Sequence, residues 1–454
     1  MASASSPVIA VVGAGFSGVM TALHLLRSGA AVRVILLERS TPVGLGAAYA
    51  THNPSHRLNV RAGNMSAWPD RPTDFVDWLE ARGEDIGPGG FATRGDYGRY
   101  LQSLLTGIVE GAQAAGRLVV APDAVVGLEP GGPGWRLTTA MGRPILADAV
   151  VLALGNPPPC RPAGVDKPLA ASKAYVADPW RWDPARTPPG PVLLLGTGLT
   201  MVDLTLSLED ASPGRTIIAL SRRGLTPREH EGEPPARPPS PPASDIPPLA
   251  ALAWLRRTAA AHGWRTAVDA LRPATQDLWR GWNARQKQTF LRHARPFWDV
   301  HRHRLSPEVA ARIADLRRSG RLKVAAGKIV RLTETDDGRV EGAWRPRGEV
   351  GSLPFQVSAV INATGPTGDV TRSDDPLVLD LIRRGLARPD ALRLGLDVDA
   401  DNRLLDVSGS ASPTLFAVGP VTRGAWWEIN AVPDIRGQAA QVAAETLAAA
   451  TRRD

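Results

Sequence analysis

The sequence is poor in cysteine, and this limits its chemistry. Cys160 is the single cysteine among 454 residues. One thiol excludes an intramolecular disulfide, a CxxC redox pair and a cysteine-based metal site. Chemistry that relays electrons through a dithiol is therefore excluded.

Long hydrophobic runs are missing as well. No stretch reaches the roughly 18 consecutive apolar residues that indicate a membrane span. The first strand is expected from Val8, and no positively charged leader precedes it, so the start does not resemble a signal peptide. We expect a cytoplasmic protein with no membrane partner.

Basic residues outnumber acidic ones, which gives a formal net charge of +8. The arginines are spread along the chain, aromatic residues make up only 5%, and no motif for stacking single-stranded bases is present. We therefore expect no nucleic-acid partner. The charge fits phosphate- or carboxylate-bearing ligands, or it reflects an arginine-rich composition alone.

The first informative motif is a glycine turn near the N-terminus. An apolar run from Val8 to Val12 leads into Gly13-Ala14-Gly15-Phe16-Ser17-Gly18, and a helical pattern follows. Glycines at these spacings bend the chain, admit a pyrophosphate and let the helix pack on the strand. The next strand ends in Glu38. Its carboxylate can accept hydrogen bonds from ribose hydroxyls, and its negative charge repels a 2′-phosphate. The pattern predicts FAD or NAD and disfavours NADP.

A second, less regular turn follows the apolar run from Val192 to Leu195. Its sequence is Gly196-Thr197-Gly198-Leu199, and Met201 stands where a third glycine is usual. The following strand ends in Ser221-Arg222-Arg223, and guanidinium groups there favour a 2′-phosphate. The pattern of this unit predicts that it binds NADPH. The alternative is that these arginines bind no ligand and are only solvated.

Two segments interrupt this second unit. Thr226 to Pro248 contains nine prolines and predicts an extended linker. Leu249 to Gly320 is helical in pattern, begins one helix at Ser306-Pro307 and is rich in tryptophan. The tryptophans predict either a helical core or a cover over a substrate, and the two need not exclude each other.

The paired turns, together with Ala363-Thr364-Gly365 and Leu415 to Gly419, resemble the two-dinucleotide-binding-domain flavoproteins. The resemblance implies an α/β fold with two Rossmann-like domains, in which an NADPH domain is inserted into an FAD domain. The expected boundaries are residues 1–187 and 356–454 for the FAD domain and 188–355 for the NADPH domain, with the proline-rich and helical insert at 226–320.

A narrower resemblance involves Leu58 to Ser66, Trp68-Pro69-Asp70 and Trp298 to Arg304. These segments resemble a bacterial family of FAD/NAD(P)-binding proteins related to flavin-dependent monooxygenases. The resemblance implies that Asn59 to Ser66 lies beside the flavin; the alternative is an ordinary loop. The predicted cofactor-binding residues are Gly13, Gly15, Phe16, Ser17, Gly18, Glu38, Arg39, Asn59, Val60, Met65, Ser66, Gly155, Gly196, Gly198, Leu199, Thr200, Ser221, Arg222, Arg223, Thr364, Gly365, Gly419 and Ile435.

Several subgroups of these flavoproteins fit poorly. Disulfide reductases carry a CxxC pair and often Gly-Asp at the late strand, where this chain has Gly419-Pro420. The long fingerprint of Baeyer-Villiger monooxygenases includes a histidine that Tyr175 to Pro184 lacks. Amine and amino-acid N-hydroxylases do without that fingerprint, so monooxygenation remains as a class.

The resemblance also implies that a set of substrate-side candidates lies near the predicted flavin. They are Asn59, Arg423, Trp427, Glu428 and Asn430, the last four between Gly419 and a helix expected from Pro433. His293, His301 and His303 stand among arginines, which disfavours a metal site and predicts either an anion-receptive surface or a solvated basic helix. We predict no metal.

These observations favour an enzyme in which NADPH reduces FAD. Reduced flavin would then react with oxygen and, through a flavin-oxygen adduct, hydroxylate a small amine- or acid-bearing substrate. Two alternatives are a reductase that passes electrons to another acceptor and a non-catalytic flavin-binding regulatory protein. The sequence leaves the substrate and the oligomeric state open.

Overall fold

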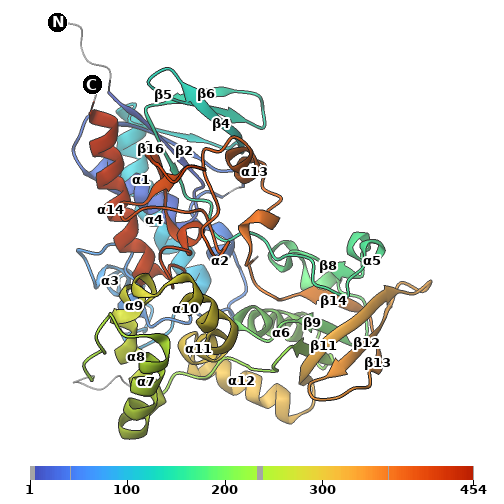
Figure 1. Ribbon diagram of the computed structural model, residues 1–454. Helices are drawn as coiled ribbons and strands as arrows, with labels where there is room; N and C mark the ends of the chain where they lie inside the picture. The colour runs from blue at the N-terminus through green and yellow to red at the C-terminus, as the bar shows by residue number, and fades with distance from the viewer. Residues whose placement is uncertain (1–5, 41, 233–238, 367, 453–454) are drawn as a thin grey trace, which may run out of the picture.

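The computed structural model describes residues 6–40, 42–232, 239–366 and 368–452. It contains two α/β domains, each built on its own mainly parallel sheet, and a layer of helices (Figure 1). No helix in these ranges is both long and apolar enough to cross a membrane.

The first domain is built on a six-stranded sheet. Its order is β15-β16-β7-β1-β2-β3, with β15 antiparallel and the other strands parallel. The strands are β1 (Val8–Val12), β2 (Arg33–Leu37), β3 (Leu118–Ala121), β7 (Ala149–Leu152), β15 (Arg403–Leu405) and β16 (Ala411–Ala417). Short apolar runs such as β1 are buried on both faces, as a covered parallel sheet requires.

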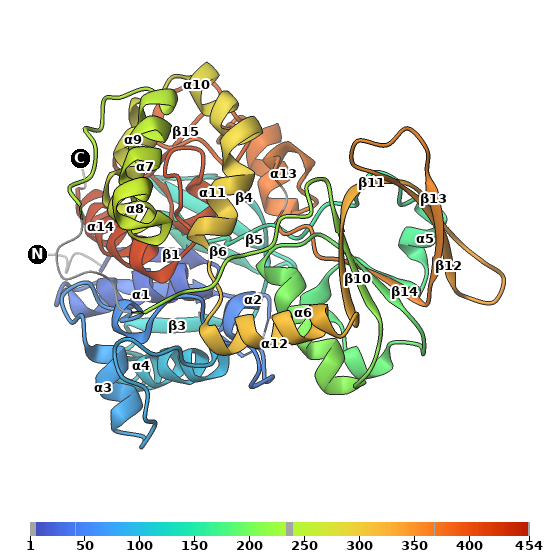
Figure 2. The same cartoon turned by 90° about the horizontal axis from the view of Figure 1, so that it is seen from below.

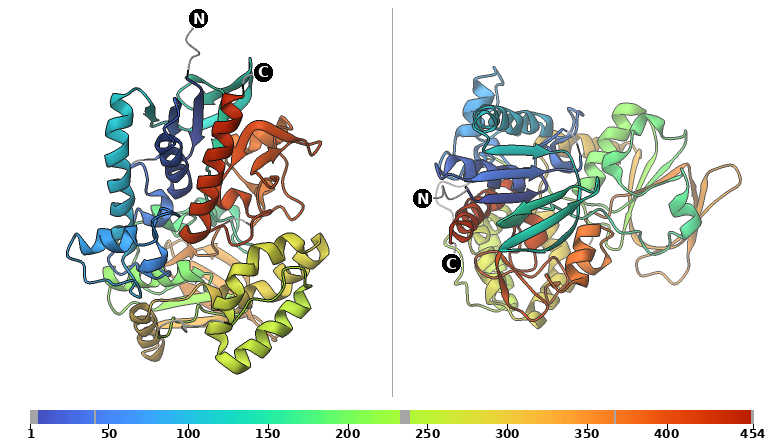
Figure 3. Two further views of the ribbon diagram at one scale, coloured as in Figure 1. Left: turned by 90° about the vertical axis from the view of Figure 1, so that its left-hand side faces the viewer. Right: turned by 90° about the horizontal axis from the view of Figure 1, so that it is seen from above.

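Helices cover one face of this sheet and a smaller sheet covers the other. The helices are α1 (Phe16–Arg27), α4 (Arg94–Ala114) and α14 (Val432–Thr451), with the short α2 (Gly46–Tyr49) and α3 (Asp74–Glu80) nearby. On the opposite face lie β4 (Val125–Gly131), β5 (Gly134–Thr139), β6 (Pro144–Ala147) and α13 (Pro376–Arg383). Figure 3 shows α1 and α14 side by side, in agreement with the contacts between them.

The second domain has a seven-stranded sheet of order β13-β12-β11-β10-β9-β14-β8. The strands are β8 (Tyr175–Val176), β9 (Val192–Leu195), β10 (Ile217–Ser221), β11 (Leu322–Glu334), β12 (Val340–Pro346), β13 (Leu353–Val357) and β14 (Ala359–Asn362). Helices α6 (Leu199–Ala211) and α12 (Pro307–Arg318) cover one face, and α5 (Lys167–Ala171) lies on the other. The ribbon β11–β13 projects away from the first domain (Figure 2).

This sheet extends beyond the expected range 188–355 at both ends. Strand β14 pairs in parallel with β9 and with β8, so the apolar run at 359–362 belongs to the second sheet. The sequence placed that run at the return to the first domain, and the expected boundaries need correction here. Helix α12 also leaves the expected insert, since Val309, Ile313 and Leu316 pack in the core of the second sheet.

The helical insert proper consists of five helices. They are α7 (Pro248–His262), α8 (Trp264–Leu271), α9 (Thr275–Gly281), α10 (Ala284–Thr289) and α11 (Arg295–Arg302). A π-helical turn at Phe290–Ala294 joins α10 to α11. The described parts of the proline-rich segment before α7 form neither helix nor strand, as its composition predicts; residues 233–238 lie outside the described ranges.

Candidate functional site

The first glycine turn has the geometry of a nucleotide-binding loop. A Cβ on Gly13, whose φ is +99°, would lie 2.4 Å from the backbone oxygen of Ala153, and one on Gly18 would lie 1.8 Å from the oxygen of Gly13. Both positions require glycine. Gly15 is different, because its nearest neighbour would be the Cα of Gly46 at 3.8 Å. The open side of Gly15 leaves room for a phosphate to approach the backbone.

Helix α1 begins at this turn without a side-chain cap. Gly15 occupies the N-cap position and the first helical turn contains no acidic residue, so its free N–H groups and helix dipole favour an anion. Glu38 lies at the end of β2, where Oε2 accepts a hydrogen bond from Ala14 N at 2.8 Å. Its Oε1 accepts one from Ser40 N at 3.0 Å. The carboxylate is thus fixed beside the turn, and its contact with a ribose stays a prediction.

The second turn repeats this geometry with one substitution. Gly196 has a φ of +126°, and its Cβ would lie 2.2 Å from the oxygen of Ala363, while Gly198 faces open space. Met201, at the usual place of the third glycine, is fully buried in the core between α6 and the sheet. Its flexible side chain packs in that core. The helix begins at Leu199, with Thr200 in its first turn.

The polar residues that end β10 differ in availability. The hydroxyl of Ser221 lies 2.8 Å from Thr197 Oγ1 and accepts a hydrogen bond from Gly224 N at 3.0 Å, so it closes the local turn. Arg223 donates to the oxygen of Arg292 at 3.2 Å and lies over the ring of Phe297. Arg222 is exposed and has no hydrogen bond or ion pair within the described ranges. Arg222 is therefore the freer cation for a 2′-phosphate.

The predicted flavin-side segment is partly used for packing. Ser66 is fully buried, and its hydroxyl accepts a hydrogen bond from Trp68 N and donates to the oxygen of Arg71. The hydroxyl of Ser66 therefore takes part in a local turn, and its role in binding the cofactor stays a prediction. Met65 packs in the first core and Val60 against it. Asn59 is half-buried, and its backbone oxygen bonds the ring of His230 at 3.1 Å.

Three predicted cofactor-binding glycines, Gly155, Gly365 and Gly419, each follow a strand of one of the two sheets. Gly155 and Gly365 have φ values of +68° and +79° and face open space. Gly419 follows β16, and a Cβ there would lie 2.3 Å from Ser17 Oγ at the start of α1. This contact brings Gly419 against the first glycine turn. The other predicted cofactor-binding residues lie as follows. Thr364 donates a hydrogen bond to Asn362 Oδ1, and Arg39 pairs with Asp375 at the surface. Ile435 is buried in the first turn of α14.

The tryptophans of the insert hold it against the loop that precedes α14. Trp279 Nε1 donates to the oxygen of Gly424 at 2.9 Å, and Trp298 Nε1 donates to Glu428 Oε1 at 3.0 Å. Trp427 stacks on Trp279 with ring centroids 4.7 Å apart. The tryptophans therefore form the core of the insert and also fasten it over residues 424–428. Asn430 is exposed in a stretch that is otherwise mostly buried.

Glu428 is buried, and its backbone has a φ of +67°, which is uncommon outside glycine. Burial opposes its ionisation, but the positive charges of His303 and Arg302 and the Trp298 hydrogen bond outweigh this and lower its pKa. The Arg302 guanidinium lies 3.5 Å from the carboxylate. A buried, ionised carboxylate thus sits at the contact between insert and first domain.

Asp299, His303 and Glu428 bring potential ligand atoms within 4.8 Å of one another. Arg295 pairs with Asp299 at 3.3 Å, and Trp298 and Arg302 contact Glu428. Because cations already neutralise both carboxylates, we assign this group to ion pairing, and the absence of a metal stays a prediction.

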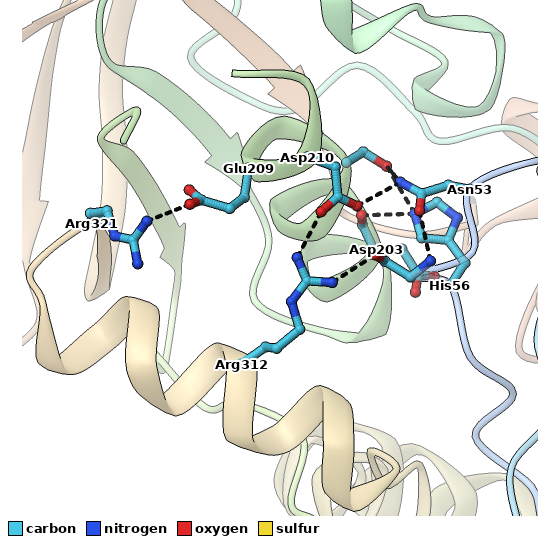
Figure 4. Close-up of polar contacts among 9 residues, drawn as sticks. Asn53, His56, Asp203, Glu209, Asp210, Arg312 and Arg321 are labelled. Carbon is cyan, nitrogen blue, oxygen red and sulfur yellow. Dashed lines mark hydrogen bonds and ion pairs between the residues drawn. The ribbon is translucent and has the colours of Figure 1, made fainter. Parts of the chain in front are cut away.

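A polar contact between the domains was not predicted from the sequence. The His56 ring lies with Nε2 3.0 Å from the oxygen of Asp203 and 2.8 Å from Ser207 Oγ, both on α6 (Figure 4). Arg94 Nη2 donates to Asp203 Oδ2 at 3.1 Å. Asn53 Nδ2 donates to Asp210 Oδ2 at 3.2 Å. The segment that leads to the predicted flavin side therefore also contacts the helix of the second glycine turn.

For the neutral ring of His56, the hydrogen bonds determine which of the two nitrogens carries the proton. A backbone oxygen only accepts, so Nε2 carries the proton toward Asp203. Nδ1 then accepts from the Thr51 hydroxyl at 2.8 Å. Arg312 of α12 strengthens the contact by donating to Ser55 Oγ at 2.6 Å and to Asp210 Oδ1 at 2.7 Å (Figure 4).

Two domains with open glycine turns, one inserted into the other, form the fold of the two-dinucleotide-binding-domain flavoproteins, and solved structures with this fold match nearly the whole chain. Residues 10–157 match the model of the FAD-NAD(P)-binding family. No curated protein has significant sequence similarity to the chain.

The similar solved structures include two amino-acid hydroxylases. The ornithine N-hydroxylase of Kutzneria sp. 744, with reduced FAD, NADP⁺ and L-ornithine, has 17% identity and a TM-score of 0.67, covering 98% of this chain and 99% of that one. L-lysine 6-monooxygenase from Pseudomonas syringae has 16% identity and a TM-score of 0.68, covering 98% and 100%. Thioredoxin reductase from T. acidophilum has 12% identity and a TM-score of 0.54, covering 98% and 99%. These likenesses show that the chain has the fold of these flavoproteins.

Proposed function

We propose that this protein is an NADPH-dependent FAD monooxygenase that hydroxylates a small amine- or acid-bearing molecule. The observation that carries the proposal is the difference between the two open glycine turns, one beside Glu38 and the other beside Arg222. The higher TM-scores of the two hydroxylases and the single cysteine support hydroxylation over disulfide reduction.

Residues of the first domain would hold FAD. The uncapped start of α1 faces the pyrophosphate side, with Gly15 admitting it, and Glu38 offers a carboxylate to the ribose. When bound, FAD would accept a hydride from NADPH, and the reduced flavin would supply the chemistry with oxygen. The start of α14 lies on the same side as Gly419, where its dipole would stabilise negative charge.

Residues of the second domain would hold NADPH. Gly198 and the uncapped start of α6 would receive its pyrophosphate, and Arg222 its 2′-phosphate. The helical insert, fastened over residues 424–428, would exclude water from the substrate side. We propose a small-molecule substrate and no nucleic-acid or membrane partner.

The absorption spectrum of the purified protein, taken before and after anaerobic NADPH, tests the cofactors. A flavin spectrum that bleaches with NADPH and much less with NADH is expected, whereas a protein that does not take up FAD would contradict the proposal. Substrate-linked incorporation of labelled oxygen tests the reaction. Full turnover without oxygen, with an artificial electron acceptor, would instead identify a reductase.

A further inference from the structure

Arg423 is a buried cation without a partner. Only 6% of its surface is exposed, and its Nε is enclosed with no hydrogen-bond acceptor in reach. Its guanidinium group has no hydrogen bond or ion pair anywhere in the described ranges. Buried charges in proteins are normally paired, so this group calls for a ligand.

The neighbouring arginines differ from Arg423 in having carboxylate partners of their own. The pairs are Arg295–Asp299 at 3.3 Å, Arg302–Glu428 at 3.5 Å and Arg272–Asp434 at 3.4 Å. The remaining nearby carboxylate, Asp390, accepts backbone hydrogen bonds from Leu392 at 2.8 Å and Gly395 at 2.7 Å. Among the residues that the structure describes, no carboxylate lies at ion-pair distance from Arg423.

The surroundings leave Arg423 charged. Burial lowers its pKa to about 10, the repulsion of Arg295 adds to this, and Asp390, Asp299 and Glu428 act in the opposite direction. At neutral pH the group therefore keeps its proton. A positive charge enclosed in this way has the strongest attraction for a compact anion.

Its place in the fold indicates which molecule would bring that anion. Arg423 follows the turn at Gly419–Thr422, whose first residue approaches Ser17 at the first glycine turn. Trp279 bonds the next residue, Gly424, so the insert covers this side. Arg423 thus lies between the proposed flavin side and the cover.

We propose that Arg423 binds a carboxylate group of the small-molecule substrate. A planar guanidinium offers two parallel N–H groups to the two oxygens of a carboxylate, which an ammonium or amide ligand does not match. The inference rests on the proposed function and narrows its substrate from amine- or acid-bearing to acid-bearing molecules.

Calorimetric titration of the FAD-loaded protein tests this with two matched pairs of probes. Acetate and benzoate should bind about tenfold or more tightly than acetamide and benzamide, which have nearly the same shape and no charge. Arg423→Gln should weaken the binding of acetate and of benzoate by about tenfold or more, and Arg423→Lys should weaken it by less. Arg331→Gln, which removes an exposed charge on β11, should leave both titrations unchanged.

The proposal is overturned if acids and amides bind equally, if none of the four binds, or if Arg423→Gln binds the acids like wild type. Should Arg423→Gln not fold, the wild-type comparison of acids with amides still decides. Bleaching by NADPH is measured on the same wild-type sample. If NADPH does not bleach the flavin, the proposed function is wrong, whatever the titration of acids against amides shows. If NADPH bleaches the flavin but the acids bind no better than the amides, only the role of Arg423 is wrong.

Discussion

The ring of His56 in the first domain donates a hydrogen bond of 3.0 Å to the backbone oxygen of Asp203 in the second. Asp203 lies on the helix that starts at the second glycine turn, and His56 precedes the segment assigned to the flavin side. The His56 side chain is thus one of several that connect the first domain to the helix of the second glycine turn.

Replacing His56 by alanine should slow hydride transfer from NADPH to FAD. Small displacements of reacting groups cost up to about a hundredfold in rate, so we expect about tenfold or more. Stopped-flow flavin reduction measures it. His52→Ala, at an exposed site in the same loop, serves as control. An unchanged rate in His56→Ala would remove its positioning role.

Gly15 and Gly18 should respond differently to alanine. Gly18→Ala places a Cβ 1.8 Å from the oxygen of Gly13 and should lower the free energy of unfolding by about 1–3 kcal/mol. The Cβ of Gly15→Ala would meet only the Cα of Gly46, at 3.8 Å, so this variant should keep the stability of the FAD-free protein while weakening the binding of FAD by about tenfold or more. Thermal unfolding and FAD titration separate the two effects. Equal loss of stability in both variants would contradict the assignment of Gly15 to the phosphate.

Arg222 should carry the preference for NADPH. Arg222→Gln should raise KM for NADPH by about tenfold with little change for NADH, because only NADPH has the 2′-phosphate. Arg223→Gln should do less, since the guanidinium of Arg223 bonds Arg292 and lies over Phe297. Steady-state kinetics with both cofactors provide the measurement, and parallel losses for NADH and NADPH would argue against phosphate recognition.

His230 should make the protein less stable in acid. Burial lowers its pKa from 6.5 to about 4, so the unfolded chain binds a proton that the folded protein excludes. Stability from this group is complete above pH 6.5 and is lost as the pH falls toward 4. His230→Asn should flatten the dependence of the unfolding free energy on pH in this window. The exposed His262→Asn is the control, and the same slope in both variants would contradict the prediction.

Trp298→Phe should loosen the insert. It leaves Glu428 Oε1 buried without its donor, at a cost of about 1–3 kcal/mol. Urea unfolding measures the loss, and hydrogen exchange should show greater opening of residues 424–428. Trp180→Phe, at an exposed position, provides the matched control.

Local patterns predicted the parts of this fold that local forces decide. Strand β9 coincides with the predicted apolar run. Ser306 caps α12 by accepting a hydrogen bond from Val309 N, as Ser306-Pro307 indicated. The requirement for glycine at Gly13 also followed from the motif, because only a close backbone approach explains it.

Tertiary partners decided the rest. A four-residue apolar run such as β14 fits either sheet, and only its pairing with β9 assigns it to the second. The hydroxyl of Ser66 satisfies its own turn, and His56 meets a helix far along the chain; neither leaves a trace in local spacing. Arg423 was a candidate from its position, but its lack of a partner appears only once its neighbours are in place.

The placement of β14 and β8 has a consequence for dissecting the molecule. A fragment cut at 188 and 355 would lose both strands and expose the backbone of β9, whose side chains are all buried, as a bare sheet edge. Such edges recruit other chains and aggregate. The nucleotide domain is therefore not a continuous cassette: excising it, or exchanging it with that of another flavoprotein, requires joining the flanking segments that contain β8 and β14.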